Sequence, residues 1–399
     1  MASVRSALII GGGVAGPVAA LALRKAGIEA TVCEAYPNPA DGIGGALAIA
    51  PNGLAALDVV GARDAATDTA LPIPRSALSF GGRLVELPRL ADLPPMQIVH
   101  RADLHRALHE TAAGQGIEIQ HNKRLVTAEE DATGVTARFT DGSTVTADVL
   151  IGADGIHSTV RTLVDPDAPG PGYTGMLGFE SVIDRRVAGE PGTMFFTFGK
   201  RAYYLYWPLP DGRTHWGANL PQDKPMSLTE ARAVPTEEWL RRLHDAYGED
   251  DPGGSLVRHI DPERLHVTGS LHIMPSVPHW HRGRLVLVGD AVHAPSNSSG
   301  QGASLAIESA VEVARCLRDL PDPQSAFAAY EARRRPRVEG IAARAGKINQ
   351  AKAPGRLAKA LLPVMMRVLL KTAMKPEKTF GAEQRYRMDW NEPATLVSA

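Results

Sequence analysis

The sequence predicts an α/β protein in which a parallel sheet is joined to an antiparallel second lobe. Three observations favour this fold class. A glycine-rich turn lies between an apolar strand and a helix near the N-terminus, two later glycine–aspartate pairs each follow a buried strand, and the aromatic residues are concentrated in one stretch. At 399 residues the chain is also too long for one simple core. We therefore expect two lobes, with the chain leaving the nucleotide-binding part and later returning to it.

The composition excludes several classes of protein. A formal net charge of −1, without a long run of one sign, argues against a nucleic-acid-binding protein. The two cysteines, Cys33 and Cys316, are too few for a disulfide framework and fall in a predicted strand and a predicted helix. A first strand that begins at Ala7 leaves no room for a signal peptide, and no apolar run has the length of a membrane span. These features predict a cytoplasmic protein with small-molecule partners and no integral membrane segment.

The first 34 residues fit a dinucleotide-binding β–α–β unit. In a G-x-G-x-x-G turn the first glycine permits the turn, the second lets a pyrophosphate approach the backbone, and the third packs the helix on the strand. The helix that follows directs its N–H groups and the positive end of its dipole at the phosphates. The residues predicted to surround the pyrophosphate are Gly11, Gly13, Val14, Ala15 and Gly16.

Glu34 completes this unit at the end of the second strand. An acid at this distance from the glycines can accept hydrogen bonds from an adenosine ribose and repels a 2′-phosphate. The stretch therefore predicts FAD or NAD rather than NADP, and leaves the choice between FAD and NAD open.

The following segments alternate between helices and strands. The pattern predicts a loop over 37–45, a helix over Ala46–Gly61, a hairpin over Leu78–Leu87 that turns at Gly81-Gly82, a strand near Ile98, and a helix from Ala102. Strands are then predicted near 117–119, 124–129, 135–140 and 144–150, the last two joined by a turn at Asp141-Gly142. We interpret these strands as an antiparallel insert.

Ten of the 21 aromatic residues lie between Tyr173 and Trp216, which indicates the second lobe. Three alternating segments, Met194–Phe198, Ala202–Trp207 and Thr214–Asn219, predict an antiparallel meander whose aromatic side chains divide between two faces. Ordinary burial accounts for about half of them as core, and the others could line an apolar pocket. The residues proposed for this pocket are Phe195, Tyr204, Tyr206 and Trp216.

The chain then returns to the first lobe through a buried strand over 284–288 and a helix over Ala303–Leu317, which Gly300-Gln301-Gly302 opens. A later stretch, Arg356–Lys375, has five basic residues and no acids. A helix that caps the domain explains it better than a membrane-surface helix. The predicted domains are 1–171, with segments near 72–95 that contribute to the substrate side, then 172–266, the return at 267–345, and a helical segment over 346–399.

Two further elements indicate FAD. Gly152-Ala153-Asp154-Gly155 follows one strand, and Gly289-Asp290-Ala291-Val292-His293 follows another. Either alone could be a strand-end turn with an aspartate cap. Together with the first motif, and in this order, they resemble the fingerprint of the FAD-dependent aromatic hydroxylases, the class A flavoprotein monooxygenases of the p-hydroxybenzoate hydroxylase type. The resemblance covers about residues 5–345.

This resemblance implies a Rossmann-like FAD-binding domain with an antiparallel substrate domain, and non-covalent FAD. It implies that Arg101 reaches the ribityl and phosphate region, that Asp154 and Gly155 contact FAD and the nicotinamide, and that Asp290, beside Gly289, accepts from the ribityl chain. The backbone at the start of the last helix is implied to meet the pyrimidine side of the flavin, at Gly300, Gln301, Gly302 and Ala303.

The implied activity is oxygenation, most simply hydroxylation, of an aromatic or polyketide-like molecule by a flavin C4a-hydroperoxide, with NADH or NADPH and O2 as co-substrates. An FAD-dependent dehydrogenase or reductase is the alternative, and a nucleotide-binding sensor a remote one. Substrate, coenzyme preference, type of oxygenation and oligomeric state stay open.

The sequence assigns no catalytic acid or base. His293, Asn297 and Gly300 are the candidates at the flavin edge, although Asn297 stands where relatives have proline, and Ser309 where an acid usually follows Ile-Glu. His105 and His109 have the i, i+4 spacing of metal ligands, but without a third ligand motif they are expected to be partly exposed helix residues, and no metal is predicted.

Overall fold

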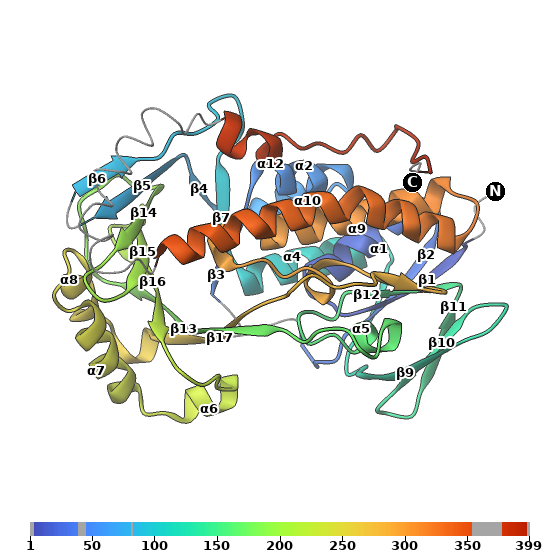
Figure 1. Cartoon of the computed structure of the whole chain (residues 1–399), viewed down its shortest axis with the longest axis horizontal. Coiled ribbons are helices and arrows are strands. Elements are labelled where there is room, and N and C mark those ends of the chain that lie inside the picture. Colours follow the sequence, from blue (N-terminus) through green and yellow to red (C-terminus); the bar gives the residue numbers. More distant parts are fainter. Residues whose placement is uncertain (1–3, 39–44, 81–82, 353–376, 397–399) are drawn as a thin grey trace.

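The computed structural model describes residues 4–38, 45–80, 83–352 and 377–396. Figure 1 shows two lobes, with helix α10 of the first lobe running beside α9 along the long axis of the molecule. The first lobe is built on a six-stranded sheet in the order β18-β19-β12-β1-β2-β8, which is parallel except for β18. Its strands are β1 Ser6–Ile10, β2 Glu29–Cys33, β8 Glu118–Gln120, β12 Val149–Gly152, β18 His281–Arg282 and β19 Leu285–Leu287. The predicted α/β fold with a parallel sheet is confirmed.

Helices of the first lobe bury their apolar faces against this sheet and against one another. They are α1 Ala15–Lys25, α2 Pro51–Val59, α3 Arg63–Thr67, α4 Arg101–Gly114, α5 Thr159–Val164, α9 Gly302–Asp319 and α10 Pro323–Lys352. Helix α9 contacts α1, α2 and α10 and is buried along almost its whole length, so it is the central helix of the lobe. Cys33 and Cys316 are buried free thiols.

Two small sheets flank the first lobe. One has the order β3-β7-β4, with β3 Ala46–Ile49, β4 Leu71–Ile73 and β7 Met96–His100; the other is the antiparallel β9 Leu125–Glu130, β10 Val135–Phe139 and β11 Thr144–Ala147. The predicted turn at Asp141-Gly142 joins β10 to β11, and Gly142 has φ +82°.

Three sequence predictions are corrected in this lobe. The segment Ala46–Gly61 is not all helix, because its first four residues form β3 and pair with β7, and the helix begins only at Pro51. The segment 144–150 is two strands, divided at Asp148, whose carboxylate accepts the N–H groups of Arg5 and Ser6 at 2.7 and 2.9 Å. The strand near 117–119 is not part of the antiparallel insert, since β8 is the edge of the parallel sheet.

The second lobe is a seven-stranded sheet in the order β17-β13-β16-β15-β14-β5-β6. Its strands are β5 Arg75–Phe80, β6 Arg83–Glu86, β13 Gly172–Ile183, β14 Thr193–Phe198, β15 Tyr203–Pro208, β16 Thr214–Pro221 and β17 His266–Ile273. The predicted meander β14–β15–β16 is confirmed, but β5 pairs with β14 in parallel, so the sheet is mixed. Its helices are α6 Leu228–Ala233, α7 Thr236–Tyr247 and α8 Gly253–Val257.

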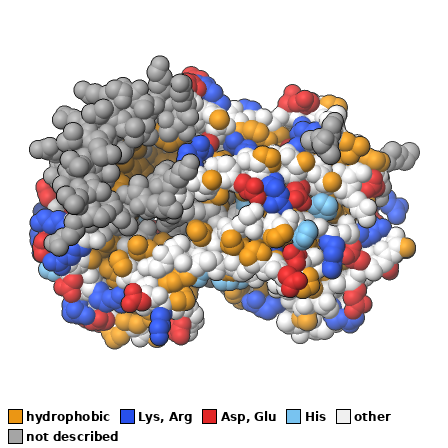
Figure 2. Space-filling model, in the orientation of Figure 1, with side chains coloured by type: hydrophobic (Ala, Val, Ile, Leu, Met, Phe, Trp, Pro, Cys, Tyr) orange, Lys and Arg blue, Asp and Glu red, His pale blue; other side chains and the backbone are white. Residues whose placement is uncertain are grey.

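The remaining described elements are short. They are the 3₁₀ turns η1 Pro262–Arg264, η2 Gly289–Ala291 and η3 Asn297–Ser299, the π-helical turn η4 Glu377–Gly381, and α12 Ala382–Gln384. The predicted capping helix at Arg356–Lys375 and the turn at Gly81-Gly82 lie outside the described residues. Within the described ranges, no helix combines the length and apolar character needed to cross a membrane. On the face shown in Figure 2, acidic and basic side chains are intermingled rather than gathered by sign.

Candidate functional site

The turn between β1 and α1 contains three glycines under different constraints. Gly11 has φ +108°, and a Cβ there would lie 2.4 Å from the carbonyl oxygen of Ala153. A Cβ at Gly16 would lie 1.9 Å from the carbonyl oxygen of Gly11. A Cβ at Gly13, by contrast, would meet no atom within 4 Å. Two of the glycines are therefore required by packing, and the third borders open space, as a phosphate-binding turn requires.

Gly12, inside this turn, is held from two sides. Oε2 of Glu34 accepts its N–H at 2.6 Å, while Oε1 accepts the N–H of Tyr36 at 2.9 Å. On the other side, Nε2 of His109 lies 2.5 Å from the carbonyl oxygen of Gly12. Because burial lowers the pKa of His109, the neutral ring donates from Nε2 to this oxygen. Both side chains thus fix the shape of the glycine turn.

His109 corrects one prediction, because it is buried rather than partly exposed. It lies on α4 beside the buried Leu108, and its ring reaches the glycine turn. His105 is partly exposed, as expected. The part of the chain that the structure describes contains no group of three or more possible metal ligands. No local pattern connects residue 109 with residue 12, so the sequence alone gave no signal for this contact.

Asp154, at the end of β12, uses its carboxylate to begin α5. Oδ1 accepts the hydroxyl of Ser158 at 2.5 Å, and Oδ2 accepts the N–H groups of Thr159 and Val160 at 2.7 and 3.1 Å. Burial raises the pKa of Asp154, and these hydrogen bonds oppose that rise. The aspartate is therefore a helix cap in this structure, which leaves Gly155, with φ +77°, as the more open member of the pair. Contact of either residue with a cofactor stays a prediction.

Gly289 lies where the first turns of two helices meet. It has φ +60°, and a Cβ there would lie 3.1 Å from Cβ of Ala15 on α1 and 3.2 Å from Cβ of Ala306 on α9. The next residue, Asp290, has an exposed side chain, although surrounding protein raises its pKa and the charge of Arg101 opposes that effect. The positive charge of Arg101 thus acts on Asp290, which lies beside two helix N-termini that both favour negative charge.

The loop from His293 to Gln301 connects Asp290 to α9. Asn297 is exposed and is the first residue of η3, and its carbonyl oxygen accepts the N–H of Gly300, which has φ +60°. The N–H of Gln301 donates to Oγ of Ser299 at 3.0 Å. Both N–H groups are thus bonded within the loop, and contact of Gly300 or Gln301 with a cofactor stays a prediction. The first turn of α9, at Gly302 and Ala303, presents the remaining donors.

His293 is buried, and its Nε2 lies 2.8 Å from Oγ of Ser309 on α9. Burial lowers its pKa to about 3. The imidazole is thus neutral near pH 7 and a weak base, so the geometry supports the interpretation of His293 as a residue that fixes the loop.

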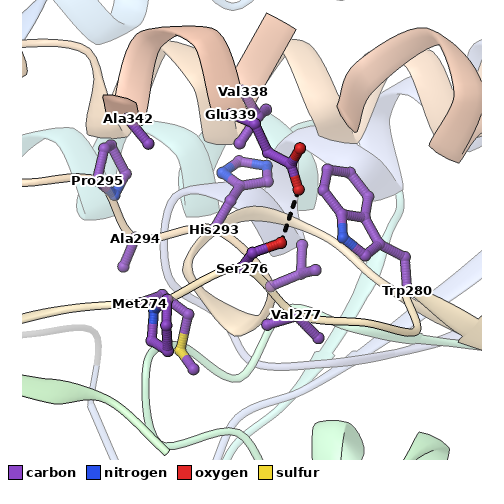
Figure 3. A pocket seen from close by; sticks show the side chains of 12 residues that line it. Met274, Ser276, Val277, Trp280, His293, Ala294, Pro295, Val338, Glu339 and Ala342 are labelled. Carbon is purple, nitrogen blue, oxygen red and sulfur yellow. Dashed lines mark hydrogen bonds between the residues drawn. The ribbon is translucent and has the colours of Figure 1, made fainter. Parts of the chain in front are cut away.

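A cavity of about 280 Å³ lies behind this loop, between it and α10. Figure 3 shows Trp280, Val277 and Met274 on one side and Val338 and Ala342 on the other, with Ala294 and Pro295 of the loop between them. The loop therefore borders open space at Ala294 and Pro295, while its turn η3 contacts α10.

The four residues predicted to line a substrate pocket lie on the outer face of the second sheet, which α7 covers. Phe195, Tyr204, Tyr206 and Trp216 are all at most 4 % exposed and belong to the closed core that Trp239, Leu243 and Tyr247 of α7 cover. A closed core admits no ligand, so these four residues stabilise the lobe and do not form the pocket. Alternation along the strands identified two faces but not the one that α7 covers.

The opposite, inner face of the sheet packs toward the first lobe. Phe196, Leu205 and Trp207 contact β3, β4 and β7. The ring of His215 stacks on Trp207 with centroids 4.0 Å apart, and its Nε2 lies 3.2 Å from Oε2 of Glu180. The same carboxylate oxygen accepts the N–H of Ala46 at 2.8 Å, and the carbonyl oxygen of Gly45 accepts the N–H of Arg101 at 3.1 Å. The inner face thus lies directly beside Arg101.

A glycine turn at the end of a parallel strand, two further glycine-bearing strand ends beside it, and a second sheet with an aromatic inner face define a two-lobed dinucleotide-binding enzyme. Comparisons with known proteins agree. A family model described as an FAD binding domain matches residues 5–345. The FAD-dependent urate hydroxylase of Klebsiella pneumoniae is 30 % identical over 351 residues, which cover 86 % of this chain and 88 % of the relative.

The 3-amino-4-hydroxybenzoate 2-monooxygenase of Streptomyces cremeus is 31 % identical over 361 residues, 86 % of each chain. Among solved structures, Klebsiella pneumoniae HpxO complexed with FAD and uric acid superposes with a TM-score of 0.80 at 25 % identity, covering 96 % of this chain and 97 % of that one. The chain therefore belongs to the FAD-dependent aromatic hydroxylase family and is an FAD-dependent monooxygenase.

Proposed function

We propose that this enzyme hydroxylates a small, electron-rich aromatic or heteroaromatic molecule in the cytoplasm, with NADH or NADPH and O2 as co-substrates. The observation that carries the substrate class is the inner face of the second sheet. It presents aromatic side chains beside a polar pair, Glu180 and His215. Glu180 accepts the N–H of Ala46, and the preceding residue, Gly45, accepts the N–H of Arg101. The named relatives act on urate and on an aminohydroxybenzoate, which are planar rings with hydrogen-bonding substituents.

The residues present fit FAD. The open space at Gly13 and the N-terminus of α1 would receive the pyrophosphate, and Glu34 would accept from the adenosine ribose while it holds Gly12. Arg101 and Asp290 would hold the sugar-phosphate part, since a carboxylate accepts well from hydroxyl groups. FAD, when bound, transfers electrons from the nicotinamide to O2, which is chemistry that no side chain supplies.

The protein contributes electrostatics and exclusion of water. The N-terminus of α9, with open space at Gly302, would stabilise negative charge on the ring system of the flavin. On the substrate side, Glu180 and His215 would orient a phenol or ring N–H and hold its proton. Phe196 and Leu205 of the same face, which are only partly buried, would pack against the flat face of the ring.

Labelled oxygen tests this proposal. Product made from NAD(P)H and ¹⁸O₂ should carry one labelled atom by mass spectrometry. The relatives named above are hydroxylases and monooxygenases, so they give the dehydrogenase alternative no support. Unlabelled product, with all reducing equivalents recovered as peroxide, would restore that alternative.

We predict that Asp290→Ala weakens FAD binding. Loss of a charge-assisted hydrogen bond costs about 1.5–3 kcal/mol, which corresponds to an increase of about 10- to 150-fold in the Kd for FAD. Fluorescence titration of the FAD-free protein measures this change. Asp167→Ala, at an exposed position outside the site, is the control and should bind FAD as the wild type does. Equal affinity in the two variants would contradict the assignment of Asp290.

We also predict that Asn297→Pro reduces peroxide leakage. Asn297 is the first residue of η3, a position where proline fits, and Ser296 before it is extended at φ −52° and ψ 142°, as proline requires of its predecessor. Proline at a compatible site stabilises by about 0.4–1 kcal/mol, so the stiffer loop should form about twofold less peroxide per NAD(P)H oxidised with substrate present. A variant that melts like the wild type but leaks as much or more would show that this turn does not control water access.

A further inference from the structure

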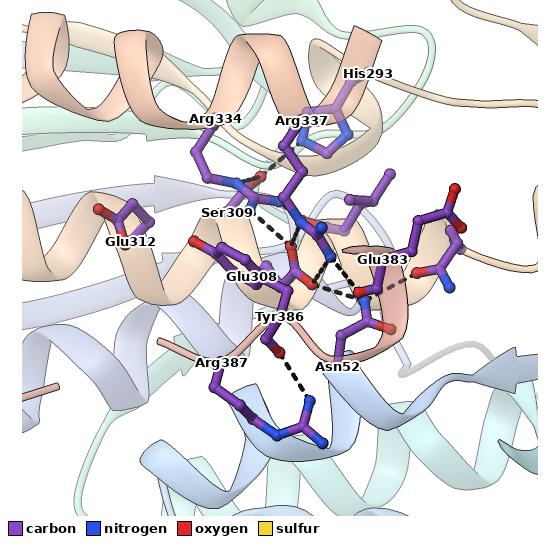
Figure 4. A network of polar contacts seen from close by, with 12 residues as sticks. Asn52, His293, Glu308, Ser309, Glu312, Arg334, Arg337, Glu383, Tyr386 and Arg387 are labelled. Atoms are coloured by element: carbon purple, nitrogen blue, oxygen red, sulfur yellow. Dashed lines mark hydrogen bonds and ion pairs between the residues drawn. The ribbon is translucent and has the colours of Figure 1, made fainter. Parts of the chain in front are cut away.

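We propose that the buried ion pair between Glu308 and Arg334 positions the loop 293–301 by holding both of its ends. The placement of this loop at the flavin rests on the proposed function, whereas the tethering itself does not. The two residues lie on α9 and α10, both side chains are 0 % exposed, and Nη1 of Arg334 is 2.7 Å from Oε2 of Glu308. Figure 4 shows the pair at the centre of a polar network between the two helices.

The first end of the loop is tied through Ser309. His293 places Nε2 2.8 Å from Oγ of Ser309, and Nε of Arg334 donates to the same oxygen at 3.2 Å. Arg334 also donates to the carbonyl oxygen of Leu305 on α9. The ring of His293 is therefore joined to the ion pair by a single shared hydroxyl.

The second end is tied through Asn52, on α2. Its Nδ2 group donates to Oε1 of Gln301 at 2.9 Å and to Oε1 of Glu308 at 2.7 Å. Asn52 and Gln301 are at most 3 % exposed, so water does not compete for these bonds. Gln301 thus reaches the same carboxylate through one amide group.

The carboxylate of Glu308 is kept in its charged form by its arginine neighbours. Burial by itself favours the neutral acid, but the charges of Arg334 and Arg337 hold the pKa of Glu308 below its ordinary value. Arg337 adds two hydrogen bonds to Glu308 at 2.8 Å and donates to the carbonyl oxygens of Ala382 and Glu383 in the C-terminal segment. Glu308 therefore accepts three hydrogen bonds from within the protein, in addition to its ion pair with Arg334.

Two considerations indicate positioning rather than stability. A buried ion pair gives little net stability compared with apolar packing of the same volume, and its best-attested use is to fix one arrangement among several. Near its first end, at Ala294 and Pro295, the loop borders the cavity between it and α10, so side-chain packing is incomplete there, while η3 contacts α10 further along. The side chains at its two ends, His293 and Gln301, are then placed by the tethers that end at Arg334 and Glu308. Between them, the carbonyl oxygen of Ala294 accepts the N–H of Met274 at 2.8 Å.

The chain offers a matched control. Glu312 lies one turn along α9, is 1 % exposed, and pairs with Arg315 at 2.8 Å. Arg315 makes its other hydrogen bonds to the C-terminal segment, at Asp389 and Glu392, rather than to the loop or its tethers. Glu308→Gln and Glu312→Gln therefore remove the same charge from similar buried ion pairs. Asn52→Leu cuts the tether to Gln301 and leaves both partners of the central pair in place.

Hydrogen–deuterium exchange of the peptide that covers 293–301, measured on the FAD-loaded enzyme, tests the proposal. Loss of one tether of ordinary strength should speed exchange in this peptide by about tenfold in Glu308→Gln and in Asn52→Leu, with no change in Glu312→Gln. During turnover with substrate, Glu308→Gln and Asn52→Leu should form more peroxide per NAD(P)H oxidised than the wild type. Glu312→Gln should form the same amount as the wild type.

Exchange unchanged from the wild type in Asn52→Leu, or equally fast in Glu312→Gln, would overturn the proposal. Asn52→Leu decides the question if Glu308→Gln does not fold. Faster exchange together with a negative result from the labelled-oxygen experiment would leave the tethering intact and remove only the assignment of the loop to the flavin.

Discussion

Gly16→Ala is expected to leave little folded protein. The added methyl would lie 1.9 Å from the carbonyl oxygen of Gly11, and that backbone cannot move away, because the N–H of Gly11 donates to Cys33 and β1 is bonded on both sides. Forced overpacking of this kind costs about 3 kcal/mol or more, a large part of the 5–15 kcal/mol that stabilises a typical domain. Soluble yield and the urea unfolding midpoint measure the loss.

Gly13→Ala is the matched variant, with the opposite expectation. Its methyl meets no atom within 4 Å, so the free energy of unfolding should change by less than about 0.5 kcal/mol. FAD affinity should fall sharply, because the methyl occupies the space proposed for the pyrophosphate. A Gly13→Ala enzyme with normal FAD affinity would contradict this assignment, and a fully stable Gly16→Ala enzyme would contradict the packing argument.

Trp216→Ala should destabilise the second lobe by about 3–5 kcal/mol, the usual cost of removing a large buried aromatic side chain. Trp216 is fully buried and packs edge-on against Tyr247 at a centroid distance of 5.6 Å. Differential scanning calorimetry should therefore show a lower Tm.

Leu205→Ala, on the inner face of the neighbouring strand, provides the contrast. Leu205 is only partly buried, so its removal should cost much less stability but should raise the KM for the aromatic substrate. The reverse result, a stable Trp216→Ala enzyme with a raised KM, would support the original prediction that Trp216 lines the substrate pocket.

The nucleotide-binding part could be predicted because its signals are local. Gly11, Gly13, Gly16 and Glu34 all lie within one β–α–β unit, and each constraint on them arises from chain neighbours or from the adjacent strand. The strands that precede Asp154 and Asp290 were recognised for the same reason. The role of Asp154 as a cap could not be separated from ligand binding, since both use a carboxylate at a strand end.

The predicted pocket face is wrong because the covered face of the sheet is set by helix α7, which was not among the predicted elements. Trp239, Leu243 and Tyr247 recur every four residues and form the buried face of α7. That spacing predicts an amphipathic helix, and a helix there would have indicated which face of the sheet is covered. The contact between His109 and Gly12 has no such signal, because 97 residues separate the two and neither belongs to a shared pattern.

The parallel pairing of β5 with β14 limits how the enzyme can be recombined. Arg75 aligns with Thr193, so the second sheet contains strands from two distant parts of the chain. A fragment that begins at Gly172 would lack β5 and β6 and would expose β14 as an open edge, which is a site for aggregation. A chimaera that takes its substrate lobe from a relative must therefore exchange residues 75–86 together with 172–273. Directed evolution by fragment shuffling would favour crossovers that keep these two segments from the same parent.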